Sequence, residues 1–103
     1  MTTTTDPVGS ITEDFDLLER HIRILKTTRE NQPIGLIRLS EMTGIPKHKV
    51  RYSLKLLEQL GIIKATQEGA TVTDGYDDFM RDTDEYLRGL RTRVQNLLEC
   101  LRE

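Results

Sequence analysis

The side chains best suited to bind a charged partner lie within one short stretch, residues 47–55 (KHKVRYSLK). Apolar residues at Val50, Leu54 and Leu57 recur every three or four positions, the spacing of one buried face of an α-helix. The other positions of this helix then form an exposed basic face, to which we add one lysine further along the chain. The candidate binding residues are Lys47, His48, Lys49, Arg51, Tyr52, Lys55 and Lys64.

These residue types suit a nucleic acid. Lysine and arginine pair with phosphate groups, whereas Arg51, His48 and Tyr52 carry donors and acceptors that can contact base edges. The net charge of the whole chain, −2, conceals an uneven distribution, because residues 33–65 carry six basic and only two acidic side chains. Salt screens electrostatic interactions beyond about 10 Å at 0.1 M ionic strength, so that local charge governs local contacts. Residues 33–65 are therefore expected to contact an anionic partner.

Length and composition exclude several classes of protein. A chain of 103 residues with 36% hydrophobic and 31% charged residues is typical of one charge-rich, mainly helical domain. No apolar stretch approaches the 18 or more residues of a membrane span, and we expect no membrane partner. There is no signal-peptide pattern, and the single Cys100 cannot form an intrachain disulfide. We therefore expect a cytoplasmic protein.

No arrangement of residues indicates catalysis. His21, His48 and Cys100 fall on three separate predicted elements without the spacing of zinc ligands. The sequence contains no nucleophile with a paired base and no glycine-rich phosphate loop. We expect no enzyme activity, no metal and no cofactor. The sequence does not indicate a pocket for a small-molecule effector.

Apolar periodicity and turn residues divide the chain into six elements after a polar tail over residues 1–10. They are helices over about 12–29, 34–43 and 46–60, strands over 62–65 and 70–73, and a helix over about 74–101. The first helix carries the apolar series Ile11, Phe15, Leu18, Ile22 and Leu25, with Thr12 as its expected N-cap.

The final helix is too long for the domain that precedes it. At 1.5 Å per residue it would extend roughly 42 Å, and its apolar residues follow an a/d heptad pattern broken only by one threonine. We therefore expect a homodimer through this helix. Residues 74–85 carry six acidic side chains and one basic, whereas residues 86–103 carry four basic and two acidic, which favours antiparallel pairing with Asp84 opposite the partner's Arg91. The expected interface residues are Met80, Thr83, Leu87, Leu90, Val94, Leu97 and Leu101.

Residues 36–63 (LIRLSEMTGIPKHKVRYSLKLLEQLGII) contain a short helix, a glycine turn and a second helix. We expect Ser40 to be small where the helices cross and Gly44 to adopt positive φ. Three apolar residues would fill the wedge between the helices: Leu39, Ile45 and Val50. These features resemble the helix-turn-helix motif, and the two short strands that follow look like its winged version.

Over about residues 11–73, and with the long final helix, the chain resembles the small dimeric winged-helix regulators and chromatin proteins of archaea and bacteria. The resemblance implies a mainly α fold, a winged helix-turn-helix with three helices and a short β-hairpin wing, followed by a long C-terminal dimerisation helix. The expected domains are a flexible tail over 1–10, a winged domain over 11–73 and a coiled-coil helix over 74–103.

The function implied is that of a homodimeric transcription regulator whose helix 46–60 enters the major groove of double-stranded DNA. The wing carries Glu68 at its tip and only Lys64 at its base, so that we expect few phosphate contacts from it. Two alternatives remain open, a sequence-tolerant chromatin protein and a winged-helix module that binds other proteins of the transcription machinery.

Overall fold

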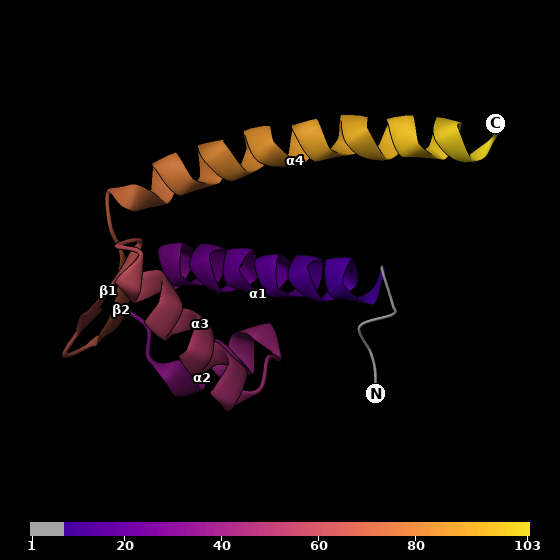
Figure 1. Cartoon of the computed structure of the whole chain (residues 1–103). Helices are drawn as coiled ribbons and strands as arrows, with labels where there is room; N and C mark the ends of the chain where they lie inside the picture. Colours follow the sequence, from indigo (N-terminus) through magenta and orange to yellow (C-terminus); the bar gives the residue numbers. More distant parts are fainter. Residues whose placement is uncertain (1–7) are drawn as a thin grey trace.

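The structure is a computed structural model that describes residues 8–103, so that most of the tail expected over residues 1–10 lies outside the described part of the chain. The last two residues of that expected tail, Gly9 and Ser10, begin the first helix. The fold is mainly helical, with a two-stranded hairpin, as predicted (Figure 1). In chain order the elements are α1 (Gly9–Asn31), α2 (Leu36–Thr43), α3 (Lys47–Gln59), β1 (Ile63–Thr66), β2 (Gly69–Val72) and α4 (Gly75–Leu101).

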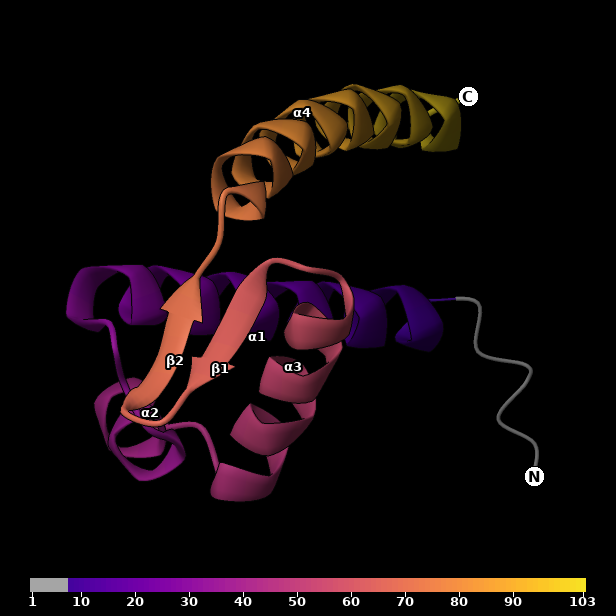
Figure 2. The same ribbon diagram turned by 90° about the vertical axis from the view of Figure 1, so that its left-hand side faces the viewer.

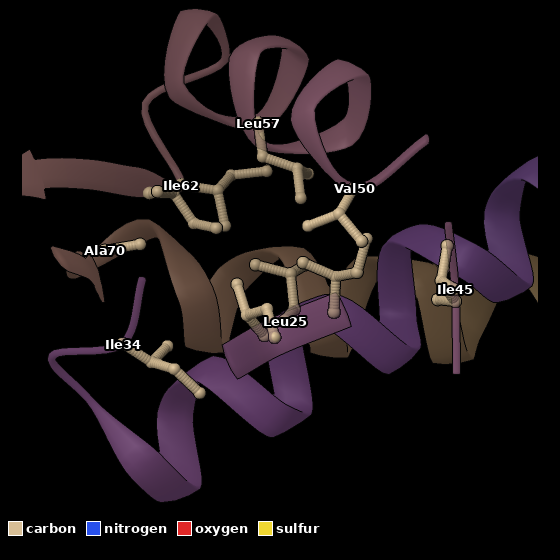
Figure 3. Packing of buried hydrophobic residues seen from close by; sticks show 10 residues of the cluster. Leu25, Ile34, Ile45, Val50, Leu57, Ile62 and Ala70 are labelled. Carbon is tan, nitrogen blue, oxygen red and sulfur yellow. The ribbon is translucent and has the colours of Figure 1, made fainter. Parts of the chain in front are cut away.

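A single hydrophobic core holds the first five elements together, and α1 is the central helix. In two perpendicular views, α2 and α3 lie on one side of α1 and α4 lies on the other (Figures 1 and 2). The core between α1, α2, α3 and the hairpin consists of Ile24, Leu25, Ile34, Leu39, Ile45, Val50, Leu57, Ile62, Ile63 and Ala70 (Figure 3). This core fixes how α3 is presented on the surface.

The turn between α2 and α3 is built as the sequence predicts. Gly44 follows α2 with φ +74°, a conformation that a side chain disfavours. Leu39, Ile45 and Val50 are buried and fill the wedge between the two helices. Ser40 has a further role beyond small size, because its hydroxyl donates a hydrogen bond of 2.6 Å to the carbonyl oxygen of Ile45.

The hairpin forms backbone hydrogen bonds with the segment that connects α1 to α2. β1 and β2 pair antiparallel, with Ile63 opposite Val72, and Ile34 forms a bridge to Ala70 through two backbone hydrogen bonds of 3.1 and 2.7 Å. Ile34 therefore belongs to this small sheet and not to the second helix, which begins at Leu36. Both strands also lie one residue away from the predicted ranges.

The first helix differs from its prediction in its start and in its buried face. α1 begins at Gly9, so that Thr12 lies within its first turn and does not cap it. The residues that α1 buries are His21, Ile24, Leu25 and Thr28. Of the predicted apolar series only Leu25 is buried, and the other four members lie on a different face that does not reach the core.

Three further large apolar side chains are exposed: Ile37 and Met42 on α2, and Leu60 directly after α3. Each belongs to an element of which only one side touches the core.

The long helix α4 buries none of its residues completely. Its first turns are anchored because Tyr76, Phe79 and Met80 pack against the core, and the Arg29 guanidinium lies 5.2 Å from the centre of the Tyr76 ring. Beyond this anchor α4 runs back along α1 in the opposite direction (Figure 1). The described chain measures 57 × 34 × 22 Å, as expected for a domain with an overhanging helix. No helix within residues 8–103 is long and apolar enough to cross a membrane.

Charged side chains along α4 pair within the helix. Arg88 donates to the Asp84 carboxylate at 2.8 Å, and this hydrogen bond, with the positive charge of Arg88, lowers the pKa of Asp84. The expected contact between Asp84 and the partner's Arg91 would therefore compete with a bond already made in the same chain. Met80, the first of the expected interface residues, packs against its own domain.

Candidate nucleic-acid interface

The basic face predicted on the third helix is present and exposed. α3 buries Val50, Ser53 and Leu57, whereas Leu54 is only partly buried. The seven candidate residues are all exposed, six of them on or beside this helix: Lys47, His48, Lys49, Arg51, Tyr52 and Lys55, with Lys64 on β1. α3, which carries six of these residues, lies on the side of α1 away from α4 (Figures 1 and 2).

These cations are free to bind an external anion. Within residues 8–103 every ion pair lies on α4, and none involves a basic side chain of α3 or β1. The first acidic residue on α3 is Glu58, near its C-terminal end. An extended anion lying across the first three turns of α3 would therefore meet four cationic side chains without displacing a carboxylate from any of them.

The structure adds Arg20, a residue that the sequence did not single out. Its Nε donates a 3.0 Å hydrogen bond to the Ser53 hydroxyl, and its guanidinium lies 5.7 Å from the centre of the Tyr52 ring. Arg20 is on α1, 33 residues away from Ser53, and no short-range pattern links the two. This contact links the half-exposed Tyr52 ring to α1.

Lys49 has a different environment from the rest of the basic group. It lines a shallow polar depression of about 320 Å³ between α1 and the start of α3, together with Arg20, Arg23, Asp16 and Glu19. The two carboxylates offset part of the positive charge there. Arg23 is engaged with the turn, since it donates to the carbonyl oxygen of Thr43 at 2.6 Å. Lys49 is thus on the flank of the interface and not at its centre.

The wing contributes little charge, as the sequence predicts. Its strands have four residues each, and the Thr66 hydroxyl donates a 2.7 Å hydrogen bond to the carbonyl oxygen of Gly69 across the turn. Gly69 has φ +135°, and a Cβ there would lie 2.6 Å from the carbonyl carbon of Ile34. A glycine is needed because two backbones meet at this point. Lys64 is the single cation of the hairpin.

The two histidines have opposite environments. His48 is exposed on α3, whereas His21 is buried on α1, with neither ring nitrogen bonded to any group within residues 8–103. Burial and, to a smaller extent, the neighbouring positive charge of Arg20 lower the pKa of His21. His21 is therefore a neutral part of the core and does not belong to the basic face. In the described part of the chain no cluster of residues could hold a metal ion.

Comparison with known proteins agrees with this geometry. Residues 17–64 match the family model of a winged helix-turn-helix DNA-binding domain. The matched segment runs from α1 to β1 and includes Arg20 and all seven candidate residues. No curated protein matches the chain.

Proposed function

Residues 17–64 belong to the winged helix-turn-helix DNA-binding family, and from this premise we propose that the protein is a homodimeric transcription regulator that reads the major groove of double-stranded DNA with α3. The observation that carries the proposal is the exposed basic face of α3, none of whose cations is paired with a carboxylate within residues 8–103. In a helix-turn-helix protein the second helix of the motif enters the major groove, and α3 is that helix.

The side chains of α3 divide into two roles. Lys47, Arg51 and Lys55 contact phosphates, which positions the helix, and Arg51 also reaches base edges. His48 and Tyr52 contact base edges, because an imidazole and a phenol can both donate and accept hydrogen bonds. Arg20 supports Tyr52 from α1, through the contacts described above.

The test is the salt dependence of DNA binding in Arg51→Ala and Lys55→Ala. Each substitution should weaken binding to every duplex similarly. Because it removes one phosphate contact from each of the two copies, it should reduce the slope of log K against log salt by about 1.8. Lys26→Ala is the matched control, because Lys26 is an exposed lysine on α1 outside the interface. Unchanged affinity and slope in both α3 variants would refute the assignment of α3 as the reading helix.

A binding selection from random DNA duplexes distinguishes a transcription regulator from a chromatin protein and from a module that binds other proteins. A regulator enriches a defined sequence, and a homodimer enriches a palindrome whose half-site spacing reports the distance between its two α3 helices. A chromatin protein retains duplexes without enrichment. A module that binds other proteins retains no DNA even at low salt. A DNA ligand agrees with the cytoplasmic location predicted from the sequence.

The dimer is proposed to form through α4, with the two copies of this helix antiparallel. Its support is the apolar series along α4, of which Val94, Leu97 and Leu101 are exposed in the single chain. Two winged domains on one duplex double the number of phosphate contacts, so that a dissociated variant should show roughly half the salt slope of the dimer.

A further inference from the structure

α1 and α4 enclose an apolar groove on the side of the molecule away from α3. Ile11, Phe15 and Leu18 line it on α1, and Leu90, Val94 and Leu97 line it on α4. The groove has a volume of about 360 Å³ and continues past Phe15 into a second hollow of about 240 Å³ beside Ile22 and Leu87. We call this surface the α1–α4 groove.

The groove explains the apolar series of α1 that does not reach the core. α1 presents two faces, one buried under α3 and the hairpin, and one, comprising Ile11, Phe15, Leu18 and Ile22, that faces α4. This second face is incompletely covered, because Ile11 is 54% and Phe15 44% exposed. On α4, Leu101 is 83% exposed. Large apolar side chains left in water favour burial against a further apolar surface.

We propose that the α1–α4 groove receives the α4 helix of a second copy of this chain, so that the N-terminal half of α1 forms half of the dimer interface. This proposal rests on the homodimer proposed above and extends it, because a dimer through α4 alone would leave the groove face of α1 uncovered. By two-fold symmetry each α4 fills the groove of the other chain, giving a bundle of four helices.

The charges beside the groove fit this occupant. The N-terminal half of α1 exposes four carboxylates before its first arginine, whereas the distal half of α4 carries three arginines: Glu13, Asp14, Asp16 and Glu19 against Arg88, Arg91 and Arg93. Asp14 and Arg93 both line the groove, yet neither is in an ion pair within residues 8–103. The α4 helix of a second copy brings arginines past the carboxylates of α1.

The exposed area approaches that of a stable interface. Six apolar side chains of the groove and of the end of α4 are about half exposed or more: Ile11, Phe15, Val94, Leu97, Leu98 and Leu101. At on the order of 100 Å² each they provide roughly 600 Å², most of the 800 Å² or so that each partner buries in an interface of standard size. Leu98 and Leu101 extend this surface towards the end of α4. Because α1 separates α4 from α3, filling the groove leaves the basic face of α3 accessible (Figures 1 and 2).

The test is the oligomeric state of the full chain, measured by sedimentation equilibrium without DNA. Phe15→Glu on α1 and Leu97→Glu on α4 should each raise the dimer dissociation constant by about 100-fold or more, since each places a carboxylate in an apolar interface. The control is Ile37→Glu on α2, a residue 58% exposed and outside the groove, which should leave the dissociation constant within about threefold. Phe15→Ala, with helicity checked by circular dichroism, replaces Phe15→Glu if that variant fails to fold.

Three outcomes would overturn the proposal. A full chain that is monomeric at tens of micromolar leaves no second copy to fill the groove. Dimers that persist in both groove variants place the interface elsewhere. A dimer lost in Leu97→Glu but retained in the folded Phe15 variant is made by α4 alone. The α3 substitutions test DNA binding separately, so that failure of the groove and failure of the proposed function can be told apart.

Discussion

His21 should make the stability of the winged domain depend on pH. The imidazole is 8% exposed, and within residues 8–103 neither Nδ1 nor Nε2 has a hydrogen-bond partner. Burial, and then the charge of Arg20, lower its pKa in the folded chain below the ordinary value of 6.5. Unfolding exposes the ring and restores that value. Protonation therefore favours the unfolded state.

The size of the effect follows from proton linkage. Because the folded-state pKa is the lower one, the full stability is present above about pH 6.5 and is lost as the pH falls towards the folded-state pKa. While only the unfolded state is protonated, the slope approaches about 1.4 kcal/mol per pH unit. The upper limit, reached when the folded state takes up no proton, is a loss of about 1 kcal/mol between pH 6.5 and 5.5, or roughly 4–8 °C in Tm for a domain of this size.

The assay is urea denaturation at about pH 7.5 and 5.5 of the wild type, His21→Leu and His48→Leu. His21→Leu should reduce the difference in stability between the two pH values, by at most about 1.4 kcal/mol. It should be no less stable than the wild type at pH 7.5, because two unsatisfied ring nitrogens leave the core. His48→Leu is the matched control, because it removes an exposed histidine in place of the buried one. An equal pH difference in wild type and His21→Leu would refute the reasoning.

Three further predictions follow from single contacts. Tyr52→Phe should reduce discrimination between the selected duplex and a scrambled one while leaving the salt slope unchanged, because the ring beneath Arg20 remains and only the hydroxyl is lost. A competition binding assay measures this discrimination, with His48→Ala as a second variant that removes a proposed base contact. Gly69→Ala should destabilise the domain by about 2 kcal/mol or more, since its Cβ would meet the backbone of Ile34. Gly89→Ala should stabilise the protein by about 0.5–1 kcal/mol, because Gly89 lies within α4 and a Cβ there meets no other atom. Thermal unfolding of both variants measures these two effects. If two antiparallel α4 helices cross at Val94 or at an earlier residue, the two copies of the exposed Cys100 lie at least roughly 18 Å apart along the helix axis. A bismaleimide with a short spacer should then not join them. Efficient cross-linking would instead indicate parallel helices.

The helix-turn-helix and the exposure of its basic residues were predictable because their signals are local. Gly44 adopts the positive φ that its position predicted, and the exposed face of α3 follows from the helical spacing of Val50, Leu54 and Leu57. The ends of α1 and α2 were less predictable. Gly9 and Ser10 have no strong helical signal, and Ile34 pairs with Ala70, a partner 36 positions away that no local pattern reveals.

The apolar series of α1 shows where periodicity stops being informative. Spacing establishes that Ile11, Phe15, Leu18 and Ile22 share a face, but not whether that face meets the core, another helix or water. In the fold, α3 and the hairpin cover the face that carries His21 and Ile24, and α4 lies over the other. A polar residue, His21, is therefore buried while a phenylalanine remains partly exposed.

Local chemistry thus accounts for the elements, the turn and the charge of α3, because each depends on residues within one or two helical turns. Packing accounts for the rest. Arg20 meets Ser53 and Tyr52, and α1 meets α4, only because the chain folds back on itself. These contacts depend on which helix faces the whole fold brings together. The spacing of residues along the sequence gives no information about a contact such as that between Arg20 and Ser53, which are 33 positions apart.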